Sequence, residues 1–229
     1  MTSTLLGRRD FITGGSSGIG YATAKSLVSD GASVFITGRN NFKLKKACKS
    51  LDVHGDSSDV RVYSSCEKSI RKATELFGGL DTVVNCAGVC ILENISNFHP
   101  NDWSKIIDIN ITGTFNTCHA AIPFLKKSKR ADIVNLGSRA GRYALAGGTA
   151  YCASKFAIRG FSESLFLDLS DYGVGVSLIA PGTVATGLDK NVVDSQMTSE
   201  DVAATISNCL TCNHTTNLNW VEMRPSKRK

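Results

Sequence analysis

The chain alternates short runs of β-type residues with longer segments whose apolar residues recur at helical spacing. This alternation predicts βαβ units, in which parallel strands form one sheet and the connecting helices cover its faces. We expect strands at 9–13, 33–37, 53–57, 80–85, 132–137, 174–180 and 218–223. We expect helices at 19–29, 41–50, 62–77, 102–126, 151–170 and 199–210. The predicted fold class is therefore α/β, a doubly wound Rossmann domain with a seven-stranded parallel sheet flanked by helices.

Nothing in the sequence divides the chain into separate units. Its 229 residues suffice for a substantial core, and 42% hydrophobic with 20% charged residues is ordinary globular composition. We find no internal repeat and no low-complexity linker. A single dinucleotide-binding and catalytic domain over residues 1–229 is expected.

Composition argues against several other classes of protein. Half of the net charge of +6 comes from residues 221–229, and no basic stretch is interleaved with aromatics, so nucleic-acid binding is not expected. No apolar run approaches the ~20 residues that span a bilayer, and residues 1–10 contain no signal-peptide core. Cys209-x-x-Cys212 before His214 has no matching second pair, so we expect no metal site. A cytoplasmic protein with reduced thiols and no membrane contact is predicted.

A glycine-rich loop between the first strand and the first helix indicates a dinucleotide site. It reads TGGSSGIG over residues 13–20. Glycine is needed where a chain turns sharply or must approach a ligand, and a helix start offers N–H groups to a pyrophosphate. The position at a strand–helix junction distinguishes this loop from an ordinary turn. The residues expected to bind the cofactor here are Gly14, Ser16, Ser17, Gly18, Ile19 and Gly20.

Arg39 bears on the choice between NADP and NAD. It stands about 20 residues beyond the loop, where a carboxylate suits a free ribose 2′-hydroxyl and a cation suits a 2′-phosphate. No acidic residue lies between Thr37 and Asn41. We therefore expect NADP (NADPH) rather than NAD, although Arg39 could also be a surface residue at a helix start. The lysines at 43, 45, 46 and 49 are expected to form a solvated face.

Three further strand ends are expected to contact the cofactor. Asp59 and Val60 follow the third strand, where Asp59 either bonds the adenine amino group or caps the next helix. Small residues after the fourth strand let the backbone pass under the cofactor, and the turn after the sixth strand can bind the nicotinamide carboxamide. The residues expected in these two turns are Asn85, Ala87, Gly88, Pro181, Gly182, Val184 and Thr186.

Tyr151 and Lys155 are the candidates for proton transfer. They are four residues apart in a predicted helix and therefore share one face. A tyrosine has an ordinary pKa near ~10, which a neighbouring ammonium lowers because it favours the phenolate. Such a pair can protonate a carbonyl oxygen or take a proton from an alcohol. On its own, a Tyr–Lys pair at this spacing is usually only a helix surface.

Two polar residues complete the predicted catalytic group. Ser138 ends the fifth strand at the carboxyl edge of the sheet, where its hydroxyl can donate to a developing alkoxide. Asn110 lies in the middle of a predicted helix, where its side chain can hold a local break and an ordered water that links Lys155 to solvent. Alternatively, Asn110 is satisfied within a bent helix.

With these motifs in their order and spacing, the chain resembles the NADP-preferring group of the short-chain dehydrogenase/reductase (SDR) family over nearly its whole length. The motifs are TGGSSGIG, NCAG, DIN, NLGS, YCASK and PGTVAT. The resemblance implies a catalytic tetrad of Asn110, Ser138, Tyr151 and Lys155, with Tyr151 as the acid/base. It also implies that Asp59 and Val60 lie at the adenine. The last strand is similar to that of 3-hydroxy acid or serine dehydrogenases and carbonyl reductases.

The resemblance implies an oxidoreductase that transfers a hydride between NADP(H) and a small carbonyl or secondary alcohol. Alternatives are a 3-oxoacyl reductase of fatty acid synthesis, which would need a basic patch for an acyl carrier, and a non-catalytic NADP-sensing module. A homodimer or homotetramer is expected through small residues of the Tyr151 helix. The loops 88–98 and 139–149 are expected to wall the pocket.

The sequence also departs from the family pattern. Arg9 and Asp10 stand where the first strand is usually apolar, which predicts weakened packing there. The stretch between Thr186 and Ser199 is short, which predicts an open site and loose substrate specificity.

Overall fold

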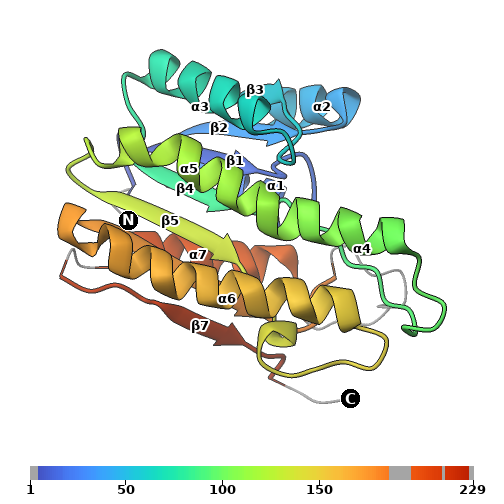
Figure 1. Ribbon diagram of the computed structural model, residues 1–229. Helices are drawn as coiled ribbons and strands as arrows, with labels where there is room; N and C mark the ends of the chain where they lie inside the picture. The colour runs from blue at the N-terminus through green and yellow to red at the C-terminus, as the bar shows by residue number, and fades with distance from the viewer. Residues whose placement is uncertain (1–4, 186–196, 213–214, 227–229) are drawn as a thin grey trace.

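A computed structural model describes residues 5–185, 197–212 and 215–226 (Figure 1). A seven-stranded sheet has the order β3-β2-β1-β4-β5-β6-β7, and every pair of neighbouring strands is parallel. The strands are β1 Arg9–Thr13, β2 Ser33–Gly38, β3 His54–Ser57, β4 Thr82–Asn85, β5 Ala131–Leu136, β6 Val174–Pro181 and β7 Trp220–Met223. The predicted fold class is confirmed.

Helices cover both faces of the sheet. The α-helices are α1 Gly18–Ser29, α2 Asn41–Leu51, α3 Tyr63–Phe77, α4 Pro100–Ile107, α5 Gly113–Leu125, α6 Thr149–Leu169 and α7 Ser199–Thr211. Figure 1 shows α3, α5 and α6 in front of the sheet, with α1 and α7 behind it. This two-sided cover explains why the inner strands, such as β4 and β6, are buried along both faces rather than alternating with exposed residues.

Each face of the sheet has its own core. Ile36 packs with α1, α2 and α7 on one face, whereas its neighbour Phe35 packs with α3 and α5 on the other. Phe11 of β1 stacks on Phe35 with ring centroids 5.8 Å apart. Successive residues of one strand therefore serve opposite cores, as the two-residue period of a strand requires.

The helix expected over 102–126 is interrupted. Between α4 and α5 the chain forms a π-helix, Asp108–Thr112, which includes Asn110. A π-helical turn contains one extra residue and is frequent at functional sites. The predicted local break at Asn110 is therefore present.

The charged start of β1 is buried and held by ion pairs, and the expectation of weakened packing stays a prediction. Asp10 is fully buried and lies 3.9 Å from the guanidinium of Arg8. Arg9 donates from Nε and Nη2 to the two carboxylate oxygens of Asp81, at 2.8 and 2.6 Å. A two-bond guanidinium–carboxylate pair is among the stronger polar contacts in proteins. These ion pairs take the place of apolar packing at the start of the strand.

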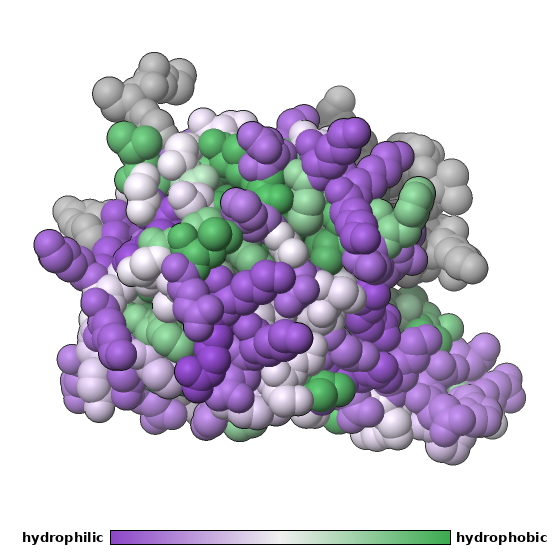
Figure 2. All heavy atoms as spheres, turned by 90° about the horizontal axis from the view of Figure 1, so that it is seen from above, coloured by the Kyte–Doolittle hydropathy of each residue, from purple (hydrophilic) through white to green (hydrophobic). Residues whose placement is uncertain are grey.

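The described part of the surface is mixed in character. The side that carries α2 and α3 is mostly hydrophilic, with separate small hydrophobic patches (Figure 2). Among the described residues, no helix combines the length and apolar character needed to cross a membrane. Within the same residues, no three His, Cys, Asp or Glu side chains gather as metal ligands. His214, from the Cys-x-x-Cys stretch, lies outside them.

Candidate active site

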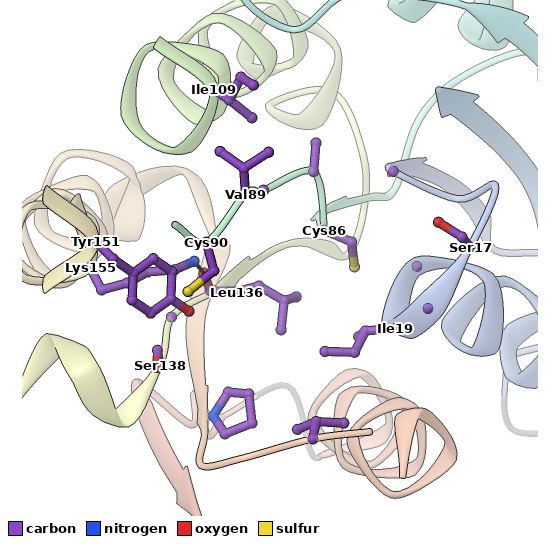
Figure 3. A pocket seen from close by; sticks show the side chains of 18 of the residues that line it. Ser17, Ile19, Cys86, Val89, Cys90, Ile109, Leu136, Ser138, Tyr151 and Lys155 are labelled. Atoms are coloured by element: carbon purple, nitrogen blue, oxygen red, sulfur yellow. Dashed lines mark hydrogen bonds between the residues drawn. The ribbon is translucent and has the colours of Figure 1, made fainter. Parts of the chain in front are cut away.

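A cavity of about 520 Å³ opens along the carboxyl ends of the parallel strands. It spans the point between β1 and β4 where the strand order reverses, which is where open α/β sheets bind ligands. Figure 3 shows Ser17 and Ile19 of the α1 region at one end, and Ser138, Tyr151 and Lys155 at the other. The fold thus brings the predicted cofactor and proton-transfer residues to one continuous cavity.

The glycine-rich loop forms the α1 end of this cavity, and its shape requires glycine. Gly14 has φ +68°, and a Cβ there would lie 3.0 Å from the backbone of Ala87. A Cβ on Gly20 would lie 2.5 Å from the carbonyl oxygen of Gly14. Ser17 precedes α1, yet no side chain caps this helix and its first turn holds no acidic residue. The N–H groups of the first turn are therefore available to an anion.

The six loop residues predicted to bind the cofactor all line the cavity. They are Gly14, Ser16, Ser17, Gly18, Ile19 and Gly20.

Two cations stand beside the loop rather than one. Arg39 lines the cavity as predicted, and so does Lys43. Asn40 accepts a hydrogen bond from the backbone N–H of Lys43 at 2.9 Å and so begins α2, which puts Lys43 in the first turn. Lys43 is therefore not part of a purely solvated face, which corrects the expectation for this residue. Lys45, by contrast, is exposed and does not line the cavity.

Of the adjacent residues Asp59 and Val60, only one reaches the cavity. Val60 lines the cavity, whereas Asp59 does not. The Asp59 carboxylate accepts bonds from Arg61 Nε at 3.0 Å and Nη2 at 2.6 Å, and this contact lowers the pKa of Asp59. The helix α3 begins at Tyr63 after Val62, so the alternative that Asp59 caps it was wrong. An arginine two residues downstream was the available signal for this pairing.

The turn after β4 reaches the cavity through its backbone and small residues. Ala87 and Gly88 line the cavity, and the Ala87 N–H donates to Thr13 Oγ1 at 3.1 Å. The side chain of Asn85 is buried and donates instead to Asn135 Oδ1 at 2.9 Å. This amide joins β4 to β5 inside the sheet, so its side chain does not line the cavity.

Tyr151, Lys155 and Ser138 all line the α6 end of the cavity. Lys155 Nζ donates to the Leu136 carbonyl at 2.7 Å and lies 5.8 Å from the centroid of the Tyr151 ring. Burial lowers the pKa of Lys155 to about 8, because the ammonium is removed from water. The Ser138 hydroxyl accepts from the Ala140 N–H at 3.1 Å. Its proton therefore remains available for donation.

Asn110 holds this end together but does not line the cavity. Its Oδ1 accepts from the Val89 N–H at 2.9 Å, and its Nδ2 donates to the Val89 carbonyl and Ser154 Oγ, both at 3.0 Å. The amide thereby ties the π-helix both to the turn after β4 and to α6. The predicted water link to Lys155 stays a prediction.

The turn after β6 closes the remaining side. Pro181, Gly182 and Val184 line the cavity as expected, and Val184 forms a bridge with Met197. Thr186 and most of the predicted short lid lie outside the described residues.

Sequence reasoning missed part of the wall. The two loops expected to form it do contribute, through Val89, Cys90, Leu92, Arg139, Ala140, Tyr143 and Leu145. Other lining residues that were not predicted are Thr37, Gly38, Asn40, Lys43, Ser58, Cys86, Ile109, Leu136, Gly137 and Thr183. Most of these lie at or just after strand ends, which was the available signal for them, whereas Lys43 and Ile109 lie in helical turns.

Known proteins resemble this chain in sequence and in fold. The profile of the short chain dehydrogenase family matches residues 10–197. An uncharacterised oxidoreductase of Staphylococcus epidermidis is 33% identical over 219 residues, which covers 93% of this chain and 95% of the relative. The structure of serine dehydrogenase from Escherichia coli has a TM-score of 0.87 at 29% identity, covering 96% of this chain and 99% of that one. A short chain dehydrogenase from Burkholderia cenocepacia in complex with NADP has a TM-score of 0.88 at 25% identity, covering 96% and 97%.

Proposed function

The chain belongs to the short-chain dehydrogenase family, and we propose that it transfers a hydride reversibly between NADP(H) and a small carbonyl compound, giving a secondary alcohol. One observation carries the proposal. Tyr151, Lys155 and Ser138 converge at one end of a cavity whose other end is a glycine-lined anion site. A proton donor and a dinucleotide site in one cavity are what carbonyl reduction requires.

The residues present fit a dinucleotide that carries an extra phosphate. Gly14 and Gly20 leave no room for a Cβ, and the uncapped start of α1 suits the pyrophosphate. Arg39 and Lys43 would hold the 2′-phosphate, since both line the cavity and, within the described ranges, no acidic side chain lines it beside them. NADP is therefore favoured over NAD. The NADP bound to the Burkholderia cenocepacia relative supports the same choice.

When bound, the nicotinamide supplies the hydride. The chain's own part is to orient the carbonyl and deliver a proton. The Ser138 hydroxyl donates a hydrogen bond to the carbonyl oxygen, and the Tyr151 hydroxyl gives up its proton to that oxygen as it becomes an alcohol. The Lys155 ammonium beside the ring stabilises the resulting phenolate.

Asn110 acts as a positioning residue in this scheme. Its bonds to Val89 and Ser154 fix the turn after β4 against the helix that carries Tyr151 and Lys155. The opened π-helical turn offers a place for a water that returns a proton to Tyr151 through Lys155. The asparagine thus links the catalytic tyrosine to solvent without contacting substrate.

The decisive experiment follows NADPH oxidation by the purified protein with a panel of ketones and aldehydes. We expect turnover with some of them, and tighter binding of NADPH than of NADH in a fluorescence titration. Binding without any turnover would instead identify a non-catalytic NADP sensor. Absence of both binding and turnover would contradict the enzyme and the sensor together.

We further propose that the protein acts as a cytoplasmic homodimer or homotetramer. All eight cysteines lie in the described part of the chain and none is joined in a disulfide, which suits a reducing compartment. One exposed stripe of α6 consists of small residues that permit close helix packing, namely Ala153, Ala157, Gly160 and Ser164. Light scattering on the purified protein measures the assembly directly; a monomer would contradict this part of the proposal.

A further inference from the structure

We propose that the substrate carries a carboxylate and that this group binds the guanidinium of Arg139. This inference rests on the proposed function and names the substrate class of the same site. Arg139 directly follows Ser138 and lines the same cavity. A substrate whose carbonyl lies at Ser138 therefore occupies a cavity that Arg139 also lines.

The side chain of Arg139 has a defined path. A Cβ placed on Gly182 would lie 3.2 Å from Arg139 Cδ, so the aliphatic stem crosses the turn after β6 at a position without a side chain. Beyond it, the guanidinium carbon lies 5.5 Å from the centroid of the Tyr143 ring, and Tyr143 also lines the cavity. The guanidinium thus lies beside the Tyr143 ring at the cavity wall, and the side chain stays 42% exposed.

Arg139 has no hydrogen-bonded anion among the described residues. Its Nε is buried without a hydrogen-bond partner there, and lies 3.8 Å from the nearest carboxylate, that of Glu222. The side chain as a whole is 42% exposed, so a ligand in the cavity can supply an acceptor to the outer nitrogens of this guanidinium.

Glu222 is already occupied by two other arginines. Its Oε1 accepts from Arg224 Nε at 2.6 Å and its Oε2 from Arg142 Nη1 at 3.1 Å. Three guanidinium groups therefore surround one carboxylate, and all three lie near the ring of Tyr143. Arg139 is the member that reaches the cavity and lacks a hydrogen bond to Glu222. The surplus of positive charge favours an anionic substrate, and a planar carboxylate matches a guanidinium with two parallel bonds.

The test compares acetoacetate with methyl acetoacetate, which present the same ketone with and without a negative charge. We expect the wild type to reduce the acid at least about 10-fold more efficiently in kcat/KM. Arg139→Gln should remove that preference by lowering kcat/KM for the acid about 10- to 100-fold, the range for a lost hydrogen bond to a charged group. Its activity on the methyl ester and its affinity for NADPH should change by less than about 3-fold.

Arg142→Gln is the matched control, because it removes a guanidinium from the same Glu222 cluster but does not line the cavity. It should leave the ratio of acid to ester unchanged. A readout independent of turnover is the thermal shift that 3-hydroxybutyrate gives in the presence of NADP. That shift should be lost in Arg139→Gln and kept in Arg142→Gln.

Several outcomes would overturn the inference. Equal efficiency on acid and ester would contradict the proposal that the substrate carries a carboxylate, but it would leave the proposed reductase function standing. Reduction of no ketone at all would contradict the proposed function itself. A selective loss of NADPH affinity in Arg139→Gln would assign the arginine to the cofactor. A preference for substrates bound to an acyl carrier protein, weakened equally by Arg142→Gln and Arg139→Gln, would make the cluster a protein-docking surface instead.

Discussion

Charged side chains are arranged differently at the two edges of the same sheet. At the amino edge, where β1, β4 and β5 begin, Arg8 and Arg9 are bonded to Asp132 and Asp81. At the carboxyl edge, where the same strands end, Lys155 donates only to a backbone carbonyl among the bonds that the structure describes. The buried charges of the amino edge lie beside charges of opposite sign, whereas the buried Lys155 of the carboxyl edge faces a cavity.

This difference distinguishes structural charges from functional ones. Both edges contain buried ionisable groups, so burial alone does not identify the active site. A buried charge with a side-chain counterion has its partner within the fold, whereas a buried cation without one is suited to a ligand. Substitutions at the amino edge should therefore change stability, and substitutions at the carboxyl edge should change activity.

The largest expected effect is that of Tyr151→Phe at the carboxyl edge. Removal of the phenolic hydroxyl eliminates the proton donor, so turnover should fall by at least about 10²- to 10⁴-fold. The free energy of unfolding and the affinity for NADPH should stay close to wild type. Steady-state kinetics, denaturant unfolding and fluorescence titration measure the three quantities.

Tyr143→Phe is the control for this variant, because its hydroxyl also belongs to a cavity-lining tyrosine but bonds Arg224 at 3.3 Å. It should retain turnover on the methyl ester within about 3-fold. Substantial residual reduction by Tyr151→Phe would rule out the proposed proton transfer.

At the amino edge, Asp81→Ala should mainly lower stability. The Asp81 carboxylate accepts from Arg9 and from Ser128 Oγ, at 2.6 Å in the latter case, and its removal leaves a partly buried guanidinium without its partner. Loss of one partner of a buried pair costs about 3–5 kcal/mol, and the partial exposure of Arg9 favours the lower end. Urea unfolding checks this value, and activity per folded molecule should be unchanged.

The exposed pair Arg71–Glu67 on α3 is the matched control for that measurement. Glu67→Ala should cost less than about 0.5 kcal/mol, because solvent screens a surface pair. If both variants cost the same, the amino edge does not depend on its ion pairs and the comparison of the two edges fails.

The sequence predicted those features that local pattern encodes. Runs of β-type residues at regular intervals were enough to predict the sheet. Gly14 and Tyr151 were identified because their motifs stand at fixed places relative to strands and helices. Contacts between distant side chains were not predictable in this way. Arg142 and Glu222 are 80 residues apart, and no local pattern indicates that they meet.

The partners of polar residues in strands were not predictable either. Asp10 looked like a defect of β1 because its counterion, Arg8, precedes the strand and its other neighbours lie on β4 and β5. Asn85 looked like a cofactor ligand because it ends β4, but its side chain points to Asn135 on the adjacent strand. In both cases the strand was located correctly and the partner of the polar group was not.

At the carboxyl edge, Arg39→Ala should weaken binding of NADPH by about 10- to 100-fold and leave NADH unaffected, since only the 2′-phosphate loses a charged contact. Lys43→Ala should also weaken binding of NADPH, but by a smaller factor, because an ammonium makes a less directional contact. Lys45→Ala, on the same helix but outside the cavity, should change neither Kd. Fluorescence titration checks all three variants; equal weakening of NADH would mean that Arg39 does not contact the 2′-phosphate.

The smallest effect is expected from Asp10→Asn, and its size depends on pH. Burial raises the pKa of Asp10 to about 6 even though Arg8 opposes the shift. The folded state therefore binds a proton more readily than the unfolded state, so the stability that Asp10 contributes is present below about pH 4 and is lost as pH rises through about 6.

Asparagine carries no such charge, so Asp10→Asn should be on the order of 1 kcal/mol more stable than wild type at pH 8, and this advantage should shrink as the pH falls from 6 toward 4. The lowered pKa of Asp81 acts in the opposite direction, but it is common to both proteins and cancels in the difference. Urea unfolding of the two proteins at pH 8, 6 and 4 measures this difference in the free energy of unfolding. A difference independent of pH would mean that the Arg8–Asp10 pair keeps the carboxylate charged throughout, and that the amino edge is fully compensated even at its most buried residue.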